Sequence, residues 1–590
     1  MKERESRSAH DHGNRFAAAM KTAASCLVLL AAVFLSALAV PGTALAEQKV
    51  FTAGSSTDTD HTVLSRTSKN NQILSVPGSW DITRMHISFA GRDEIVIGKN
   101  NPPVSYDSEV DLSRYLGTRV PVYTGGGTLI SYLTVYHGSD IPCLFFEVDS
   151  AEFSAINRSK DNVITEGTVR VQEADGEISF DGELAHLKCR GNDTFLYSKK
   201  PYEFKLKKKT AIGGMPKGKT WILLANYRDS SLLRNQLVLD LSLEAGLPFA
   251  IHCEQTDVWV NGQYQGVYLM TEKIQISRER INIRDLEEET EKVNDEALSS
   301  YPAFDLKKGP LPIMCGFEIP NDPEDITGGY IAVIEKPHRL NKFRRPGIRT
   351  EGLLNVRIKE PTCPSLAQVM YFGARVNDMH NATIAGDGIN PDTGMHYTEY
   401  LDIVSFSKKF LIEDLSKNYD GVAGSQYLFK DSDTVDPLFY AGPSGDYDLC
   451  FGNVKTRGLS SEGDYIARVK VGPANLYSQL AAHDDFMESV SEQWRNSLRP
   501  ALAVVLGEEP AGENCSVRPM EEYVSRLKDS AAMNQARWGQ TTRAYSSAGK
   551  TFDSGTAYLE RWLRNRVAYM DGRYADQNEN ASTDEGGKEQ

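Results

Sequence analysis

The chain has 590 residues, of which 40% are hydrophobic and 25% are charged, and its formal net charge is −15. This composition is ordinary for a globular protein, and the length is enough for roughly two to four domains. Because an acidic chain repels phosphate backbones, the charge argues against nucleic acid as a partner.

The first 46 residues have the pattern of a secretory signal peptide. Basic residues precede the apolar stretch TAASCLVLLAAVFLSALAV, and PGTALA then supplies small residues at Ala44 and Ala46. This order predicts cleavage near Ala46, and therefore a secreted protein or one at the extracytoplasmic cell surface. An uncleaved membrane anchor is the alternative, because the apolar run is nearly long enough to span a bilayer.

The eight cysteines do not form a metal-binding pattern. Cys26 lies in the predicted signal peptide, and the other cysteines are widely spaced without any C-x-x-C pair. A zinc site built on cysteines is therefore not expected. Disulfides are possible in an exported protein, but the sequence does not show which cysteines would pair.

Strand patterns dominate the part of the chain that follows. Residues 47–140 are rich in Thr, Ser, Val, Tyr and Gly, which is typical of short strands joined by turns, and this pattern continues from Ile141. The segment PYEFKLKKK (residues 201–209) alternates apolar and charged side chains, as a half-buried strand does. WILLANY (residues 221–227) has the composition of a fully buried strand.

A helix and a hairpin come next. The segment DSSLLRNQLVLDLSLEAG predicts a helix that begins at a cap formed by Asp229 or Ser230 and stops at Gly246. Asn261 and Gly262 lie between two apolar runs, a strong signal for a β-hairpin.

The second half of the chain is expected to be mainly helical. Residues 286–326 are acidic and then rich in proline, which predicts a surface insertion, and residues 328–336 predict a strand. Helices dominate from Leu366, notably over residues 398–418, and residues 576–590 predict a disordered tail. Because strands come first and helices later, the sequence predicts an α+β fold.

Residues 213–220, GGMPKGKT, match the phosphate-loop pattern G-x-x-x-x-G-K-[ST]. That motif needs a helix to open at the Lys-Thr pair, so that the helix N-terminus faces the phosphates. Here WILLANY follows, which predicts a strand. We therefore interpret the segment as the tip of a hairpin rich in glycine and lysine.

Asp446 and Asp448 are two positions apart in AGPSGDYDLCFGN. On an extended segment, side chains at i and i+2 face the same way, about 7 Å apart. Two such carboxylates repel each other unless a cation lies between them, and a hard divalent cation prefers oxygen ligands. The alternative is a pair of solvated loop carboxylates.

Three further segments fit phosphoryl transfer. A turn at Gly191 leads into a strand with several lysines, which could hold phosphates, although basic strands are more often solvated. Arg234 lies in the predicted helix. The helix that ends in FLIEDLSKNYDG is followed by Asn418 and Asp420, and an aspartate there could accept a proton from a hydroxyl nucleophile. Taken singly, a solvated loop aspartate is the competing interpretation.

Together, the ordered segments CRGNDT, YSKKPYEFKLKKKT, WILLANYRDSSLLRNQL, VWVNGQYQGVYLMTEKI, GGYIAVIE, NYDG, SQYLFKD and GDYDLCFGN resemble the CotH kinase-like family, which includes the spore-coat protein H kinases. The resemblance covers about residues 141–575. It implies an atypical protein-kinase-like fold, with a mixed β-sheet N-lobe and a mostly helical C-lobe, preceded here by the β-rich extension of residues 47–140. It also implies transfer of phosphate from ATP to Ser or Thr hydroxyls of surface or coat proteins with Mg²⁺ or Mn²⁺.

The resemblance also implies roles for individual residues. The implied catalytic residues are Asp420 and Asn418, the implied metal ligands are Asp446 and Asp448, and the implied nucleotide-binding residues are Arg190, Lys205, Arg234 and Glu272. One departure matters, because the family usually has a tryptophan before the first aspartate of the pair, where this chain has Gly445. An aromatic ring there could stack on a base, so its loss weakens the case for nucleotide binding.

Two functional hypotheses follow from the sequence. The first is an exported CotH-like kinase that uses ATP and a protein substrate. The second is a catalytically silent binding or structural protein on a kinase-like scaffold, associated with the cell envelope. A phosphate-loop hydrolase is a distant third.

Overall fold

The computed structural model describes residues 50–56, 61–306, 310–335, 345–418, 421, 424–455, 459–463, 475–539 and 548–575. The predicted signal peptide (residues 1–46) and the predicted tail (residues 576–590) lie outside these residues. In the described part of the chain, no helix combines the length and the apolar character needed to cross a bilayer.

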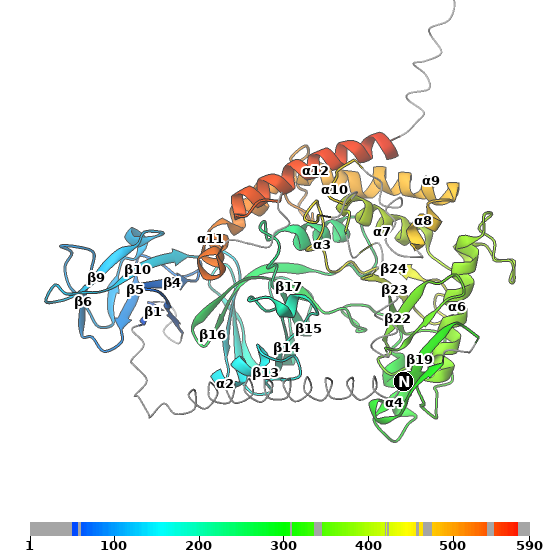
Figure 1. Ribbon diagram of the computed structural model, residues 1–590, viewed down its shortest axis with the longest axis horizontal. Helices are drawn as coiled ribbons and strands as arrows, with labels where there is room; N and C mark the ends of the chain where they lie inside the picture. Colours follow the sequence, from blue (N-terminus) through cyan, green and yellow to red (C-terminus); the bar gives the residue numbers. More distant parts are fainter. Residues whose placement is uncertain are drawn as a thin grey trace, which may run out of the picture.

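Seven strands form a sheet that closes on itself, because β15 pairs with both β14 and β17 (Figure 1). We call this unit the closed sheet. Its interior is filled by apolar side chains such as Phe146, Phe204 and Trp221. Its strands are β11 (Cys143–Glu147), β12 (Thr168–Gln172), β13 (Ile178–Cys189), β14 (Tyr202–Thr210), β15 (Gly218–Leu224), β16 (Cys253–Val260) and β17 (Gln263–Glu272).

The region before the closed sheet is rich in strands, as the sequence predicts. Strands β2, β1, β5 and β8 extend the same sheet beyond β17, and β3, β4, β10, β9, β6 and β7 form a second sheet. Phe145 and Trp259 of the closed sheet join the core of this region. The strands are β1 (Phe51–Ser55), β2 (Thr62–Leu64), β3 (Arg66–Ser68), β4 (Asn71–Val76), β5 (Met85–Phe89), β6 (Glu94–Ile97), β7 (Val104–Ser105), β8 (Ser108–Val110), β9 (Val120–Thr124) and β10 (Leu129–His137).

A third sheet has the order β18-β19-β21-β22-β20-β23-β24. It corrects the prediction that residues 286–326 are a surface insertion, because two of its strands come from that segment and Leu286 and Met314 are buried in the core. The segment begins with acidic residues, but burial of its apolar side chains, such as Met314, packs it against the core. The strands are β18 (Ala303–Leu306), β19 (Ile313–Phe317), β20 (Tyr330–Ile334), β21 (Gly347–Arg349), β22 (Asn355–Glu360), β23 (Gln426–Lys430) and β24 (Tyr440–Ala441).

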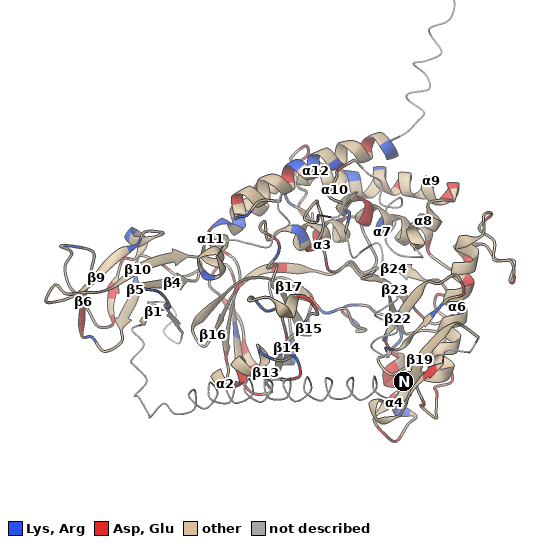
Figure 2. Cartoon of the chain, in the orientation of Figure 1, with Lys and Arg blue, Asp and Glu red and all other residues tan. Residues whose placement is uncertain are grey.

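Most helices lie in the second half of the chain, and α12 runs along the outside of the helical layer (Figure 1). Their apolar faces share one core with the third sheet and α3. Figure 2 shows acidic and basic positions interspersed over strands and helices. The helices are α2 (Ser150–Ile156), α3 (Arg234–Glu244), α4 (Leu286–Lys292), α6 (Leu366–Ile384), α7 (Ile403–Ser416), α8 (Leu476–Leu480), α9 (Asp484–Gln493), α10 (Arg499–Val505), α11 (Met520–Trp538) and α12 (Phe552–Tyr574). The fold is therefore a mixed α+β fold, as predicted.

The turn and the helix end that were predicted from short segments are confirmed, whereas the predicted helix start is not. Asn261 and Gly262 both have positive φ and join β16 to β17, as the hairpin prediction requires. Gly246, with φ of 67°, follows the end of α3. The start of that helix was placed too early, because Asp229 caps a turn and the helix begins at Arg234.

The phosphate-loop match is a turn between two strands. The residues that follow Gly218 form β15, and Lys219 is exposed on that strand. Antiparallel strands β14 and β15 flank this turn and no helix opens at Lys219, so the interpretation as a hairpin tip is confirmed.

Candidate active site

The segment from Gly442 to Asn453 carries the two aspartates, and we call it the acidic loop. The structure corrects the prediction of an extended segment, because Asp446 has φ of 74° and Asp448 lies in a turn. Asp446 is exposed and Asp448 is half-buried, while Tyr447 between them is fully buried. The two carboxylates therefore flank an anchor residue instead of alternating along a strand.

Tyr447 fixes the acidic loop against α7 and α3. Its hydroxyl donates to Glu413 Oε1 over 2.6 Å and accepts from Lys409 Nζ over 2.5 Å. Its main-chain N–H donates to Asn235 Oδ1 over 2.7 Å. Lys409 and Glu413 also form an ion pair on α7, and both are buried. A charged pair of this kind inside the protein fixes the phenol, and with it the loop, in one position.

Arg234 holds the other end of the acidic loop. Its side chain is fully buried and pairs with Asp229, and its Nε donates to the main-chain oxygen of Cys450 over 3.1 Å. The structure therefore gives Arg234 a part in joining the start of α3 to the loop. The contact with a nucleotide stays a prediction.

The end of α7 meets the acidic loop through Asn418. Lys417 ends the helix in the left-handed conformation, and Asn418 follows it, almost completely buried. Its Nδ2 donates to the main-chain oxygen of Asp446 over 3.2 Å. Asp420, the implied catalytic residue, lies outside the described residues. The structure thus brings together Asn418 and the aspartate pair and leaves the catalytic assignment as a prediction.

A group of basic residues faces the acidic loop from the closed sheet and β22. A Cβ atom at Gly445 would lie 3.6 Å from Ile274 Cδ1, just beyond the end of β17, and 4.0 Å from the ring of Tyr427 on β23. Burial raises the pKa of Tyr427, and Arg357, Arg190 and Asp446 act on the same phenol electrostatically. Arg190, which follows β13, and Asp446 of the acidic loop therefore both lie near Tyr427.

Lys359 on β22 belongs to the same basic group. Burial, and then the positive charge of Arg357, lower the pKa of the Lys359 ammonium to about 8, and Arg190 and Lys273 add to this effect. Carboxylates offset part of this repulsion, because Arg357 Nε lies 3.0 Å from Glu335 Oε1, Lys273 Nζ lies 3.8 Å from Glu203 Oε2, and Glu360 favours the ammonium form of Lys359. We call Arg190, Lys273, Arg357 and Lys359 the basic cluster.

The other two implied nucleotide residues are placed differently. Lys205 lies on β14 with an exposed side chain. Glu272 is buried at the end of β17, where its Oε2 accepts the main-chain N–H of His252 over 3.0 Å and its Oε1 lies 3.8 Å from Arg280 Nε. No contact recorded for the described residues joins either side chain to the acidic loop.

Glu203 on β14 balances part of the basic charge. Burial alone would raise its pKa, but hydrogen bonds from His186 and Lys188 and the charge of Lys273 outweigh that effect and lower the pKa to about 2. Lys188 Nζ lies 3.1 Å from this carboxylate. Glu203 therefore stays ionised and orients lysines on the outer face of the closed sheet.

The donor set around the acidic loop consists of oxygens, which suits Mg²⁺ or Mn²⁺. Asp446 and Asp448 supply carboxylate oxygens, and two further buried oxygens at the loop, Glu413 Oε2 and Asn453 Oδ1, have no hydrogen-bond partner among the described residues. Such orphaned oxygens are what a cation or an ordered water would satisfy. Among the described residues, no three His, Cys, Asp or Glu side chains lie close enough together to hold a metal.

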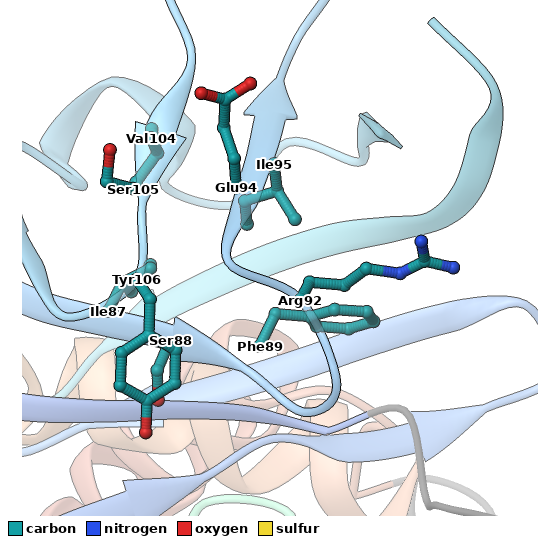
Figure 3. A pocket seen from close by; sticks show the side chains of 9 residues that line it. All are labelled: Ile87, Ser88, Phe89, Arg92, Glu94, Ile95, Val104, Ser105 and Tyr106. Carbon is teal, nitrogen blue, oxygen red and sulfur yellow. The ribbon is translucent and has the colours of Figure 1, made fainter. Parts of the chain in front are cut away.

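Two other features stand apart from this site. None of the seven cysteines among the described residues forms a disulfide. A shallow surface recess lies in the N-terminal region and is lined by β5, β6 and β7 (Figure 3), with Arg92 and Glu94 on its rim. None of the predicted site residues lines this recess.

Sequence reasoning missed Lys273, Arg357, Lys359 and Tyr427. A signal was present for two of them, because NVRIKE alternates apolar and basic residues and so places Arg357 and Lys359 on one face of β22. That pattern alone does not show which residues lie next to this face of β22.

Asp446 of the acidic loop and Arg190 and Arg357 of the basic cluster all act electrostatically on one phenol, that of Tyr427. The chain belongs to the CotH family: the family model described as CotH kinase protein matches residues 187–309 and 376–570, more than half of the chain. The matched parts contain the turn at Gly191, the hairpin, Asp420 and the acidic loop, whereas β22 falls between them. A comparison with curated proteins found no match.

Proposed function

We propose that this protein is an exported CotH-like kinase that transfers phosphate from ATP to Ser or Thr side chains of a surface or coat protein. The observation that carries the proposal is the acidic loop, held by Tyr447, Asn418 and Arg234 opposite the basic cluster. Membership of the CotH family supports the same reading. A two-lobed, kinase-like arrangement is part of this proposal, with the closed sheet as one lobe and the helices with the third sheet as the other.

Each residue has a part in the proposed reaction. Asp446 and Asp448 would hold Mg²⁺ or Mn²⁺, which supplies positive charge to neutralise phosphate oxygens. Arg190 and Lys359 would bind the phosphates from the opposite side, and Asn418 orients the acidic loop through Asp446. Asp420 would accept the proton of the substrate hydroxyl. Lys205 and Glu272 would act at the edge of the nucleotide site.

Labelled ATP tests the proposal directly. The purified protein is incubated with labelled ATP and Mg²⁺ or Mn²⁺, and phosphate incorporation into the protein is measured. We expect incorporation that is lost in Asp420→Ala and in Asp448→Ala. Lys219→Ala serves as the control, because Lys219 belongs to the rejected phosphate loop and should leave incorporation unchanged. Undiminished incorporation in both aspartate variants would overturn the site assignment.

The second candidate is a catalytically silent binding protein at the cell envelope. Gly445, which offers no ring to a base, favours it, as does the strand-rich N-terminal region before Ile141. Calorimetry separates the two functions. A protein that binds no ATP in the presence of Mg²⁺ or Mn²⁺, but binds envelope polysaccharide, belongs to this second class.

Export is part of the proposal as well, and it rests on the first 46 residues of the sequence. N-terminal sequencing of the protein recovered outside the cytoplasm tests it. We expect the mature chain to begin at or near Glu47. An intact N-terminus in the membrane fraction would support the membrane anchor instead.

A further inference from the structure

A buried lysine and an asparagine meet far from the acidic loop. Lys199, in the connection between β13 and β14, is almost completely buried, with an exposed fraction of 1%. Its Nζ contacts Asn534 Oδ1 on α11 over 3.0 Å, although the two residues are 335 positions apart in the sequence. The Nζ also contacts the main-chain oxygen of Val267 on β17. The contact therefore joins the closed sheet to a helix near the end of the chain.

The surroundings of this pair are tight and partly aromatic. The Nζ atom lies 4.4 Å from the ring centre of Tyr268. Gly266 has φ of 117°, and a Cβ atom there would lie 2.6 Å from Asn534 Oδ1 and 2.9 Å from Lys199 Cε. Only glycine allows the two side chains to approach each other over this part of β17.

Burial also prepares the amine for nucleophilic chemistry. Desolvation lowers the pKa of Lys199 to about 7, so a large fraction of the side chain is a neutral amine near neutral pH. The charged groups that act on it are Asp257 of β16, which favours the ammonium form, and Arg537 of α11, which disfavours it.

A carboxyl group of unusual basicity accompanies the pair. Burial raises the pKa of Asp257 to about 6, and Lys199 acts on this carboxylate electrostatically. Asp257 accepts hydrogen bonds of 2.6 Å from Ser530 on α11 and 2.6 Å from Tyr264 on β17. Ser530 lies one helical turn before Asn534, so the carboxylate faces the same side of α11 as the amide.

We propose that Lys199 and Asn534 form an intramolecular isopeptide bond. The neutral Nζ attacks Cγ of Asn534, a new N–C bond forms, and the bond from Cγ to the amide nitrogen breaks. One proton passes from Nζ to the leaving nitrogen, which departs as ammonia, so the reaction needs no oxidant and no cofactor. Asp257 assists electrostatically, because its carboxylate stabilises the positive charge that develops on Nζ during the attack. The product is a secondary amide that covalently joins the closed sheet to α11.

The structure also provides room for the leaving group. A cavity of about 20 Å³ is lined by Lys199, Asn534 and Trp538, together with Asn226 and Tyr227. This volume holds one molecule of the size of water, and ammonia is of similar size. The bond would close a very long loop of the chain, and a cross-link of this kind stabilises the folded state mainly by restricting the unfolded chain.

Mass spectrometry of the purified full-length protein tests the proposal. We expect an intact mass lower than that of the encoded chain, after correction for N-terminal processing, by one molecule of ammonia. Proteolysis should release a branched peptide that contains both Lys199 and Asn534. Lys199→Met and Asn534→Ala should each abolish the deficit, whereas Lys200→Met, at the neighbouring lysine, should leave it unchanged.

Asp257→Asn tests the assisting role, and we expect at least a tenfold slower appearance of the branched peptide after refolding. The rate in the wild-type protein should increase as the pH rises from about 6 to about 8, because the neutral amine is the reacting form. A folded wild-type protein that retains the full encoded mass after prolonged incubation at about pH 8 would overturn the proposal. The contact would then be a simple hydrogen bond.

Discussion

The side-chain amide of Asn418 donates a hydrogen bond to the main-chain oxygen of Asp446 over 3.2 Å. This contact joins the end of α7, which leads to the implied catalytic aspartate, to the acidic loop, which carries the implied metal ligands. Asn418 is almost completely buried, which protects the hydrogen bond from competition by water.

Asn418→Ala should therefore weaken ATP binding in the presence of Mg²⁺ and destabilise the fold moderately. Loss of a buried hydrogen bond of this kind costs about 1–3 kcal/mol. Calorimetry measures the affinity, and urea denaturation measures the free energy of unfolding. Asn381→Ala is the matched control, because Asn381 lies on α6 and its amide donates an exposed hydrogen bond to Glu351. Equal effects of the two substitutions would contradict the prediction.

Arg234→Met should destabilise the protein strongly, because it leaves the fully buried Asp229 carboxylate without its positively charged partner. Breaking a buried ion pair from one side costs about 3–5 kcal/mol. Arg84→Ala removes an exposed pair with Glu109 and should cost at most about 1 kcal/mol. Urea denaturation compares the two variants. An Arg234→Met protein as stable as Arg84→Ala would show that the buried pair does not hold the acidic loop.

ATP affinity should decrease as the pH rises through about 8, the pKa of Lys359, because only the ammonium form attracts phosphate. Lys359→Arg should retain ATP binding and lose this decrease, since arginine stays charged at alkaline pH. Lys359→Met should bind ATP weakly at every pH. Titrations at pH 7 and pH 9 measure these affinities. The same decrease in wild type and Lys359→Arg would assign it to another group.

The stability of the fold should depend on pH through Asp240. Burial raises the pKa of this carboxyl to about 7, and its oxygens accept hydrogen bonds from Tyr523 and Cys253. Because the folded pKa lies above the unfolded value, Asp240 contributes stability that is complete below about pH 4 and is lost as the pH rises through about 7.

Asp240→Asn should remove this contribution to the slope. The free energy of unfolding of the variant should therefore increase relative to that of the wild type as the pH rises from 4 to 8. Urea denaturation at several pH values measures this difference. Asp181→Asn, at a half-exposed carboxylate paired with Arg170, is the control and should not change the slope over this range. A constant difference between wild type and Asp240→Asn would contradict the assignment.

Short-range patterns in the sequence predicted a good part of the fold. The Asn261–Gly262 hairpin, the stop at Gly246 and the absence of a helix after Lys219 were all correct, because each depends on neighbouring residues. The family resemblance, which depends on several ordered segments, was also correct. The start of α3 was misplaced by a few residues, because Asp229 first closes a turn with Ser231 and accepts the main-chain N–H of Arg234, where the helix begins, from a position outside the helix.

The site could be predicted only in part. Asn418, Asp446 and Asp448 do lie together, but their backbone is irregular because Tyr447 must reach Glu413 in the core. The basic cluster could not be found from the sequence, since Lys359 and Arg190 come from different sheets and meet only across the fold.

The sequence by itself determined the fold class, the family and the residues that carry charge, because local propensity and ordered motifs are properties of short segments. Only the tertiary structure decided which charges face one another. The closure of β15 onto β17 and the contact between Lys199 and Asn534 join residues that are distant along the chain. Such contacts follow from packing of the whole core, and no short segment specifies them.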